Sequence, residues 1–251
     1  MPLFTDGLIS SIDDLSGQDS QLLDVASNEG INLSSKLALA QESLGTEITV
    51  MLGRLQFWSQ HGFWPSLANV AVTSPLRLWH TYWTLAMTYS DAYSNQLNDR
   101  YRAKRDQFQE MARWASEKLV QTGIGIVTCP VTKAATPQLL TIPGTLPDGI
   151  YYVTMSWVNA FGEEGASAVP AVVTLTTSTI QAGPGPKPQN ANGWNVFVGD
   201  SPDTMFQQNG SPIDPAQFWD QPSSLIRSGR TPGTGQEPTY ALAVPRVIPR
   251  G

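Results

Sequence analysis

A chain of 251 residues with a formal net charge of −6 is long enough for one domain or two. The acidic balance argues against a general nucleic-acid binder, which carries a basic surface. A single cysteine, Cys129, excludes an internal disulfide. Residues 1–14 have no basic segment and no long apolar run, and no window approaches the roughly 20 apolar residues of a membrane span. We therefore expect a soluble protein, made and used in a cytosol, that has no membrane partner.

The first half of the chain predicts helices. Residues 1–17 are small, polar and acidic, and we expect them to form a loop or arm. Apolar residues then recur at helical intervals over 20–29 and 32–53, with Asn32 as the N-cap of the second helix. The mixture of Trp, Gly, His and Pro over 57–72 indicates a packed loop.

Two longer helices complete this half. Ser74 and Pro75 mark the start of the third helix, as its N-cap and its first helical residue, and the apolar positions continue to Leu97. The fourth helix is expected over 99–122 and ends at Gly123. Together these segments predict a small bundle of about four helices.

After Gly123 the hydrophobic period changes to two, and Pro and Gly separate short runs of β-branched residues. The expected strands lie over 124–127, 139–142, 150–158, 168–176 and 194–199. Such a series predicts a β-sandwich. The more apolar face of the longest strand should point into its core; it consists of Tyr151, Val153, Met155 and Trp157.

The predicted fold class is therefore α+β with two domains. An α-helical bundle is expected over 1–125, a small β-sandwich over 126–220, and an extended C-terminal tail rich in Pro, Gly and Arg over 221–251. A segment of that composition is expected to be disordered when alone.

Two groups of basic residues suggest an interface. The tail carries Arg227, Arg230, Arg246 and Arg250 against the single acid Glu237. A basic tail on an acidic chain indicates docking on an acidic partner surface, and the alternative is a solvated terminus. The second group opens the fourth helix and comprises Arg100, Arg102, Lys104 and Arg105. Interleaved acids favour a subunit contact or a solvated face over a nucleic-acid site.

Little in the sequence indicates catalysis. His61 and His80 are the only histidines, and His80, inside the third helix, is expected to be a satisfied bundle residue. Cys129 has no neighbouring base and is expected to be inert. Glu163 and Glu164 lie in a Gly-flanked turn, where solvation is expected. The sequence therefore predicts no catalytic residue, no metal site and no cofactor, and so no enzyme.

Residues 70–127 resemble the head–tail connector, or adaptor, proteins of tailed bacteriophages. The resemblance lies in a helix that starts with proline, a tyrosine-rich middle, a long charged helix and an exit at glycine. The helices expected over 20–55 fit the same bundle. Residues 151–165 and 193–213 are similar to strands of the fibronectin type III-like modules of phage structural proteins. The simplest connectors lack such a module.

The resemblance implies a structural virion protein at the head–tail interface. It implies a homo-oligomeric ring, commonly of twelve copies, that binds beneath the portal protein and extends the channel through which viral DNA passes. Such a ring offers a surface to tail or nozzle proteins. Family members often grip the portal with an extended C-terminal segment, so the eight basic residues named above become the candidate subunit or portal interface.

Two alternatives stay open. The first is a phage tail or decoration protein whose β domain binds a host glycan or a virion partner. Trp157, Trp194 and Trp219 could form an aromatic platform for it, although burial in the core is the simpler account. The second alternative is an enzyme built on His61 or His80, which no recognisable partner residue supports.

Overall fold

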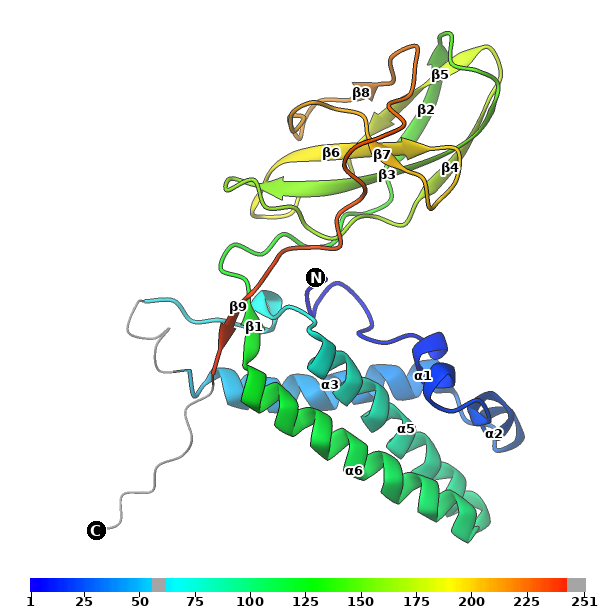
Figure 1. Ribbon diagram of the computed structural model, residues 1–251, viewed down its shortest axis with the longest axis vertical. Coiled ribbons are helices and arrows are strands. Elements are labelled where there is room, and N and C mark those ends of the chain that lie inside the picture. The colour runs from blue at the N-terminus through cyan, green and yellow to red at the C-terminus, as the bar shows by residue number, and fades with distance from the viewer. Residues whose placement is uncertain (56–61, 243–251) are drawn as a thin grey trace. The chain divides into compact units, whose positions relative to one another are not determined.

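The computed structural model describes residues 1–55 and 62–242 (Figure 1). Its architecture is α+β, as the sequence predicts: helices dominate the first half of the chain and strands the second. The contacts divide the chain into two compact units. The helical unit contains Gly7–Ile126 and the chain from Pro238 onward, and the β unit contains Met1–Asp6 and Val127–Glu237.

The helical unit is built around one central helix. Its helices are α1 (Ile12–Gln18), α2 (Leu22–Asn28), α3 (Leu33–Leu52), η1 (Leu67–Asn69, a 3-10 helix), α5 (Ser74–Gln96) and α6 (Asp99–Thr122). Helix α5 packs against α1, α2, α3 and α6, and it lies between α3 and α6. Its buried side chains therefore run almost all the way round its N-terminal two thirds, which is typical of a helix enclosed by others.

Local capping explains most of the helix boundaries. The Asn32 side chain accepts a hydrogen bond from the Ser35 amide at 3.1 Å, which confirms Asn32 as the N-cap of α3. The limits predicted for α6 are confirmed. The start of α5 is one residue earlier than predicted, because Thr73 is the N-cap and Ser74 is already helical.

The expected loop over residues 1–17 is wrong in part, because it contains the start of α1. Ser11 and Asp14 form a capping box: the Asp14 amide donates to Ser11 Oγ at 3.1 Å, and the Ser11 amide donates to Asp14 Oδ2 at 2.7 Å. Leu15 is the fully buried side chain of this helix. Two apolar residues in two turns, Ile12 and Leu15, are too few to give a readable period, which is why the pattern alone misses α1.

The β unit holds two antiparallel sheets that share one hydrophobic core. One sheet has the strand order β4-β3-β6-β7 and the other β2-β5-β8. The strands are β2 (Gln138–Pro143), β3 (Gly149–Asn159), β4 (Ala171–Leu175), β5 (Ser178–Gly183), β6 (Ala191–Gly199), β7 (Phe206–Gln207) and β8 (Trp219–Asp220). Pro170 precedes β4, which lies at a sheet edge as its proline predicts.

The longest strand, β3, is buried on both faces. Its apolar face lies in the core as predicted, with Trp157 opposite Trp194 of β6. The other face is also covered: Thr154 Oγ1 donates to the Ala168 carbonyl at 2.8 Å, and Ser156 is fully buried. The chain that follows β3 therefore folds back over the outer face of its own sheet.

The helical unit contains a strand that follows the β unit in the sequence. Strand β1 (Ile124–Ile126) pairs antiparallel with β9 (Thr239–Ala241), and Ile124 lies opposite Ala241. Gly123 has a φ of +93°, and a Cβ there would meet the Ala241 carbonyl oxygen at 3.0 Å. Glycine is needed at this position because both the backbone conformation and the neighbouring strand exclude a side chain.

The compact units assign the two chain ends differently from the predicted domains. Residues 1–6 belong to the β unit, where the Met1 ammonium donates to the Gln236 carbonyl at 2.9 Å. Residues 221–237, predicted to begin a separate tail, also belong to the β unit, and β9 belongs to the helical unit. Long-range hydrogen bonds, which leave no local pattern, hold the 221–237 segment.

The strand pairing predicts that the helical unit folds without the β unit. Ile126 and Thr239 are cross-strand partners, so replacement of residues 127–238 by Asn-Gly closes β1 and β9 into a two-residue hairpin. We expect helical circular dichroism and a cooperative thermal transition. A control closes the same gap with a long Gly/Ser linker. Loss of the transition in both variants would show that the helical unit depends on the β unit.

Candidate functional site

The predicted basic residues at the start of α6 lie together but are mostly engaged within the chain. Lys104 Nζ donates to Asp19 Oδ2 at 2.9 Å, and Arg100 Nη2 donates to Gln21 Oε1. Arg105 forms an ion pair with Asp106 at 2.6 Å, and its guanidinium lies 5.3 Å from the centroid of the Tyr93 ring. Arg102 is exposed and forms no ion pair with the described part of the chain.

Asp19 is the acceptor that draws these helices together. This buried carboxylate follows α1 and accepts from Tyr89 of α5 at 2.7 Å and from Lys104 of α6. Burial alone would raise the pKa of Asp19, but the hydrogen bonds from Lys104, Tyr89 and the Gln21 amide outweigh it and lower that pKa. Burial, and then the bond to Asp19, raise the pKa of the Tyr89 hydroxyl. No sequence pattern indicates this contact, since Asp19 lies in a short polar link between α1 and α2.

A groove runs between α5 and α6. Its volume is about 350 Å³, and it is lined by Trp79, Trp83, Gln109, Ala112, Arg113 and Ser116. The indole Nε1 of Trp83 is buried and has no hydrogen-bond partner within the described residues. Its residues follow at i and i+4 on α5 and at i, i+3, i+4 and i+7 on α6, a spacing that could have been read from the sequence.

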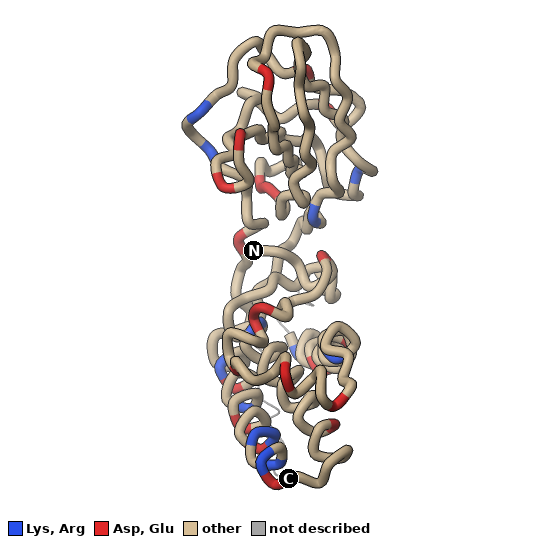
Figure 2. Tube along the Cα trace, turned by 90° about the vertical axis from the view of Figure 1, so that its right-hand side faces the viewer, with Lys and Arg blue, Asp and Glu red and all other residues tan. Residues whose placement is uncertain are grey.

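A second feature of α6 is a stripe formed by the exposed Trp114 and the partly exposed Met111 and Lys118, hereafter the α6 stripe. These residues follow at i, i+3 and i+7 and so share one side of the helix. The Trp114 side chain is 50% exposed, which is unusual for so large an apolar group. Figure 2 shows Lys and Arg gathered along α6, which carries six basic and four acidic side chains.

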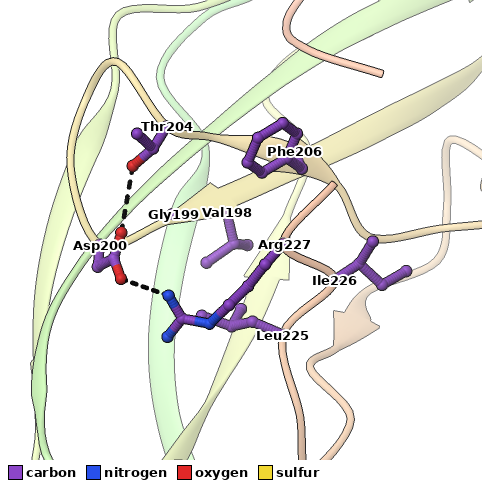
Figure 3. A pocket seen from close by; sticks show the side chains of 8 residues that line it. All are labelled: Val198, Gly199, Asp200, Thr204, Phe206, Leu225, Ile226 and Arg227. Carbon is purple, nitrogen blue, oxygen red and sulfur yellow. Dashed lines mark hydrogen bonds and ion pairs between the residues drawn. The ribbon is translucent and has the colours of Figure 1, made fainter. Parts of the chain in front are cut away.

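The β unit has a pocket of about 330 Å³ beside the β6–β7 hairpin (Figure 3). It is lined by Val198, Gly199, Asp200, Thr204, Phe206, Leu225, Ile226 and Arg227. Arg227 Nη1 donates to Asp200 Oδ2 at 2.6 Å, and Thr204 Oγ1 donates to Asp200 Oδ1 at 3.1 Å. These two hydrogen bonds, the one from Arg227 first, lower the pKa of Asp200. The predicted interface residue Arg227 thus forms one wall of the pocket.

Arg230 has a buried partner, which corrects one expectation. Glu164 was expected to be solvated but is only 6% exposed, and it forms an ion pair with Arg230 and a hydrogen bond with Ser156. Glu163 is exposed, as expected, and accepts from Gln236 Nε2 at 2.9 Å. Glu164 is buried because the 230–237 segment folds over its turn, a contact that its Gly-flanked neighbourhood does not reveal.

The aromatic platform proposed for the β domain is wrong. Trp157 and Trp194 are fully buried in the core, and Trp219 is partly buried against it. The simpler account, burial in the core, is confirmed for the first two. The predicted residues His61, Arg246 and Arg250 lie outside the described residues.

Within the described residues, no group of three or more His, Cys, Asp or Glu side chains is placed to hold a metal ion. No helix in the same residues combines the length and apolar character needed to cross a membrane.

No family model, curated protein or solved structure matches the chain.

His80 is buried in α5 and bonded on one side only. Its Nε2 lies 3.0 Å from the Leu37 carbonyl of α3, which can only accept, so Nε2 carries the proton. Its Nδ1 is buried without a partner in the described chain. Burial lowers the pKa of His80, and the bond to Leu37 and the charge of Asp14 oppose that shift only in part. Its predicted place inside the bundle is confirmed, but the expectation that its side chain is satisfied is wrong for Nδ1.

This environment predicts a pH dependence of stability. The folded state holds His80 neutral, whereas the unfolded chain takes up a proton below a pH of about 6.5. We expect the free energy of unfolding to fall as pH drops below that value, with a contribution from His80 of at most about 1.4 kcal/mol per pH unit. In His80→Gln this contribution should be absent, so the slope should be smaller, while the contribution of the Met1 amino group, whose pKa burial also lowers, remains. The free energy of unfolding should be measured by chemical denaturation between about pH 5 and 7.5. Asp14 and Asp19, whose pKa values are lowered, change their contribution to stability only below this range. Equal slopes in both proteins would contradict the assignment.

Proposed function

We propose that this protein is a head–tail connector of a tailed bacteriophage. In this proposal the helical unit forms a homo-oligomeric ring beneath the portal protein, and the ring extends the DNA channel and offers a surface to tail proteins. The resemblance of residues 70–127 to connector proteins supports the proposal, and the β unit is taken as a fibronectin type III-like module. The site of action is the head–tail interface of the virion.

The observation that carries the proposal is a pair of unlike surfaces on the helical unit. The α6 stripe presents an exposed Trp114 beside Lys118. The outer surface of α3 exposes Leu39 and Val50 together with Glu42 and Glu47, and neither glutamate has an ion pair within the described chain. Residues 7–55, which include α3, carry seven acidic and two basic side chains.

These two surfaces suit a head-to-tail contact between copies. Because α5 lies between α3 and α6, the α6 stripe of one copy can meet the α3 surface of the next without using the same patch twice. A contact of this kind closes into a ring when the rotation per copy permits. In this contact Trp114 and Lys118 of one copy would face Glu42 and Glu47 of the next. A Trp at the centre of an interface often contributes most of the binding free energy.

An acidic chain is compatible with a DNA conduit. The formal net charge of −6 gives the whole protein the sign of the duplex. A wall of like charge does not hold DNA as it passes, because association depends on opposite charge. The net charge supports a passive channel rather than a DNA-binding site.

The proposal predicts that Trp114→Ala breaks the assembly. Truncation of a central interface Trp typically costs about 2 kcal/mol or more, so each contact should weaken by at least about 30-fold. Native mass spectrometry of the full chain should show rings for the wild type and smaller species for Trp114→Ala. Phe161→Ala is the matched control, since it removes an exposed aromatic ring from the β unit. Electron microscopy with a portal protein should show the ring capping the portal. A protein that stays monomeric at high concentration, with portal and without it, would overturn the proposal.

The pocket beside the β6–β7 hairpin favours a second candidate, a tail or decoration protein whose β unit binds a host glycan. Phe206 supplies an apolar surface, and Asp200 and Arg227 supply oriented polar groups, which is the composition of a small ligand site. On a glycan array, Arg227→Ala should lose binding, while Lys187→Ala, which removes an exposed cation elsewhere in the β unit, should keep it. Wild-type protein without glycan binding would rule this candidate out.

A further inference from the structure

Strand β2 is an open edge of the three-stranded sheet. The strand order β2-β5-β8 pairs β2 with β5 alone, and no other part of the described chain bonds to its outer side (Figure 1). The β7 edge of the other sheet differs, because the Gln207 amide donates to the Arg230 carbonyl at 2.8 Å and the chain covers that edge itself. An open strand edge is a template for another strand, since its backbone groups are ready to pair.

The register of the sheet shows which backbone groups of β2 face outward. The Gln221 amide donates to the Ile180 carbonyl at 2.8 Å, so the backbone groups of Ile180 in β5 point toward β8. Its neighbour Gln181 therefore points toward β2 and bonds to its partner there, Leu140. Backbone groups alternate between the two sides along a strand, so the residues before and after Leu140 turn both their N–H and their C=O to the open side.

The open side of β2 carries two donors between two prolines. The donors are the amides of Leu139 and Thr141, and the next outward positions are Pro137 and Pro143, which have no N–H. The side chain of Leu140, between the two donors, is 56% exposed. The edge therefore offers a short, well-defined window for one more strand.

This window is complementary to itself. When Leu140 lies opposite Leu140 of a second, antiparallel copy, Leu139 of each copy lies opposite Thr141 of the other. Each of those two pairs then exchanges both of its N–H···O bonds, and the prolines end the pairing on both sides. The two exposed leucines meet at a pair without hydrogen bonds, where the Cα atoms are about 4.5 Å apart and the side chains pack.

Charge also favours a second copy as the partner. A twofold contact sets equal residues against each other near its axis, so charges there would repel, and residues 134–147 contain none. The charges that flank this stretch are Lys133 and Asp148, both exposed and without an ion pair in the described chain. Antiparallel strands bring the Lys133 end of one copy to the Asp148 end of the other, so unlike charges meet.

Strand β4 is the other open edge, and it suits a second copy less well. It exposes Val172 to 57%, close to the exposure of Leu140 in β2. The strand contacts β2 and β5 of the other sheet, and the chain turns from β4 into β5 at Thr177, whose φ is +48°. The other sheet therefore lies against one end of β4, and only Pro170 borders the strand. Strand β4 thus provides a matched control.

We propose that the β2 edge binds β2 of a second copy, antiparallel around Leu140, so that two three-stranded sheets join into one of six strands. Such a contact is isologous, so it closes with two copies and does not propagate. A single short strand pair buries little surface, which makes the contact a transient one. The inference goes beyond the connector proposal and does not depend on it, because the two contacts use different surfaces.

Disulfide trapping in the full chain tests the proposal. In a Cys129→Ser background, Leu140→Cys places the two thiols on directly opposite residues, at a Cα separation that a disulfide allows. The control is Val172→Cys on β4, whose native side chain is equally exposed. Because pairing raises the local thiol concentration, the disulfide-linked dimer should form at least about tenfold faster with Leu140→Cys. Equal rates, or a faster reaction at position 172, would overturn the proposal.

Native mass spectrometry provides a second test that is separate from the proposed ring. The full chain with Trp114→Ala, which weakens the α6 contact, should still form dimers. Adding Leu140→Lys sets like charges opposite each other and should leave monomers, whereas adding Val172→Lys should keep the dimer.

A mixture of the Leu140→Lys and Leu140→Asp proteins in that background should form dimers with one copy of each, because unlike charges are then cross-strand partners. Monomers in the mixture, or in Trp114→Ala alone, would overturn the proposal. A wild-type chain that forms dimers but no rings would count against the connector proposal alone.

Discussion

The pairing of β1 with β9 is the constraint on which the rest of the helical unit depends. It joins two strands separated by the entire inserted segment of the β unit, so the chain must close a very long loop to form it. Loop-closure entropy grows only slowly with length, and the inserted segment folds around a core of its own. Close backbone contact fixes the pairing: a Cβ at Gly123 would meet the Ala241 carbonyl, and one at Gly125 would meet the Pro238 ring at 3.0 Å. Those two glycines are therefore structural requirements of the closure.

Inside the β unit Gln236 bonds both to the N-terminal segment and to the segment by which the chain enters the unit. Its buried side chain accepts from the Val131 amide at 2.6 Å and donates to the Cys129 carbonyl at 2.9 Å, and its backbone carbonyl accepts from the Met1 ammonium. Each bond joins segments that are remote in sequence. The burial of a side-chain amide is favourable only when its hydrogen bonds are made. The three segments that Gln236 joins therefore depend on one another for their positions.

The parts of the fold that could be predicted are those whose determinants are local. Asn32 and the period of Leu37, Leu44 and Ile48 place α3, and the alternation over 150–158 places β3 with its core face. Glu164 shows what could not be predicted: its burial depends on Arg230, which is distant in sequence and was expected to lie in a tail. The same holds for Asp19, whose partners come from two other helices. Of the candidate site, the basic residues of α6 could be named in advance, but their use within the chain could not.

The candidate basic residues differ in how much stability the fold would lose if each left its internal ion pair to bind a partner. Arg227 and Asp200 are both more than half exposed, and an ion pair of that kind contributes little, so a partner carboxylate can replace Asp200 at small cost. Arg230 differs, because its departure would leave the buried Glu164 without its counter-charge, and such a loss is expensive. Lys104 is held in the same way by the buried Asp19. Among the described residues, an acidic partner is therefore expected to engage Arg102 and Arg227, whereas Arg230 and Lys104 stay with the fold.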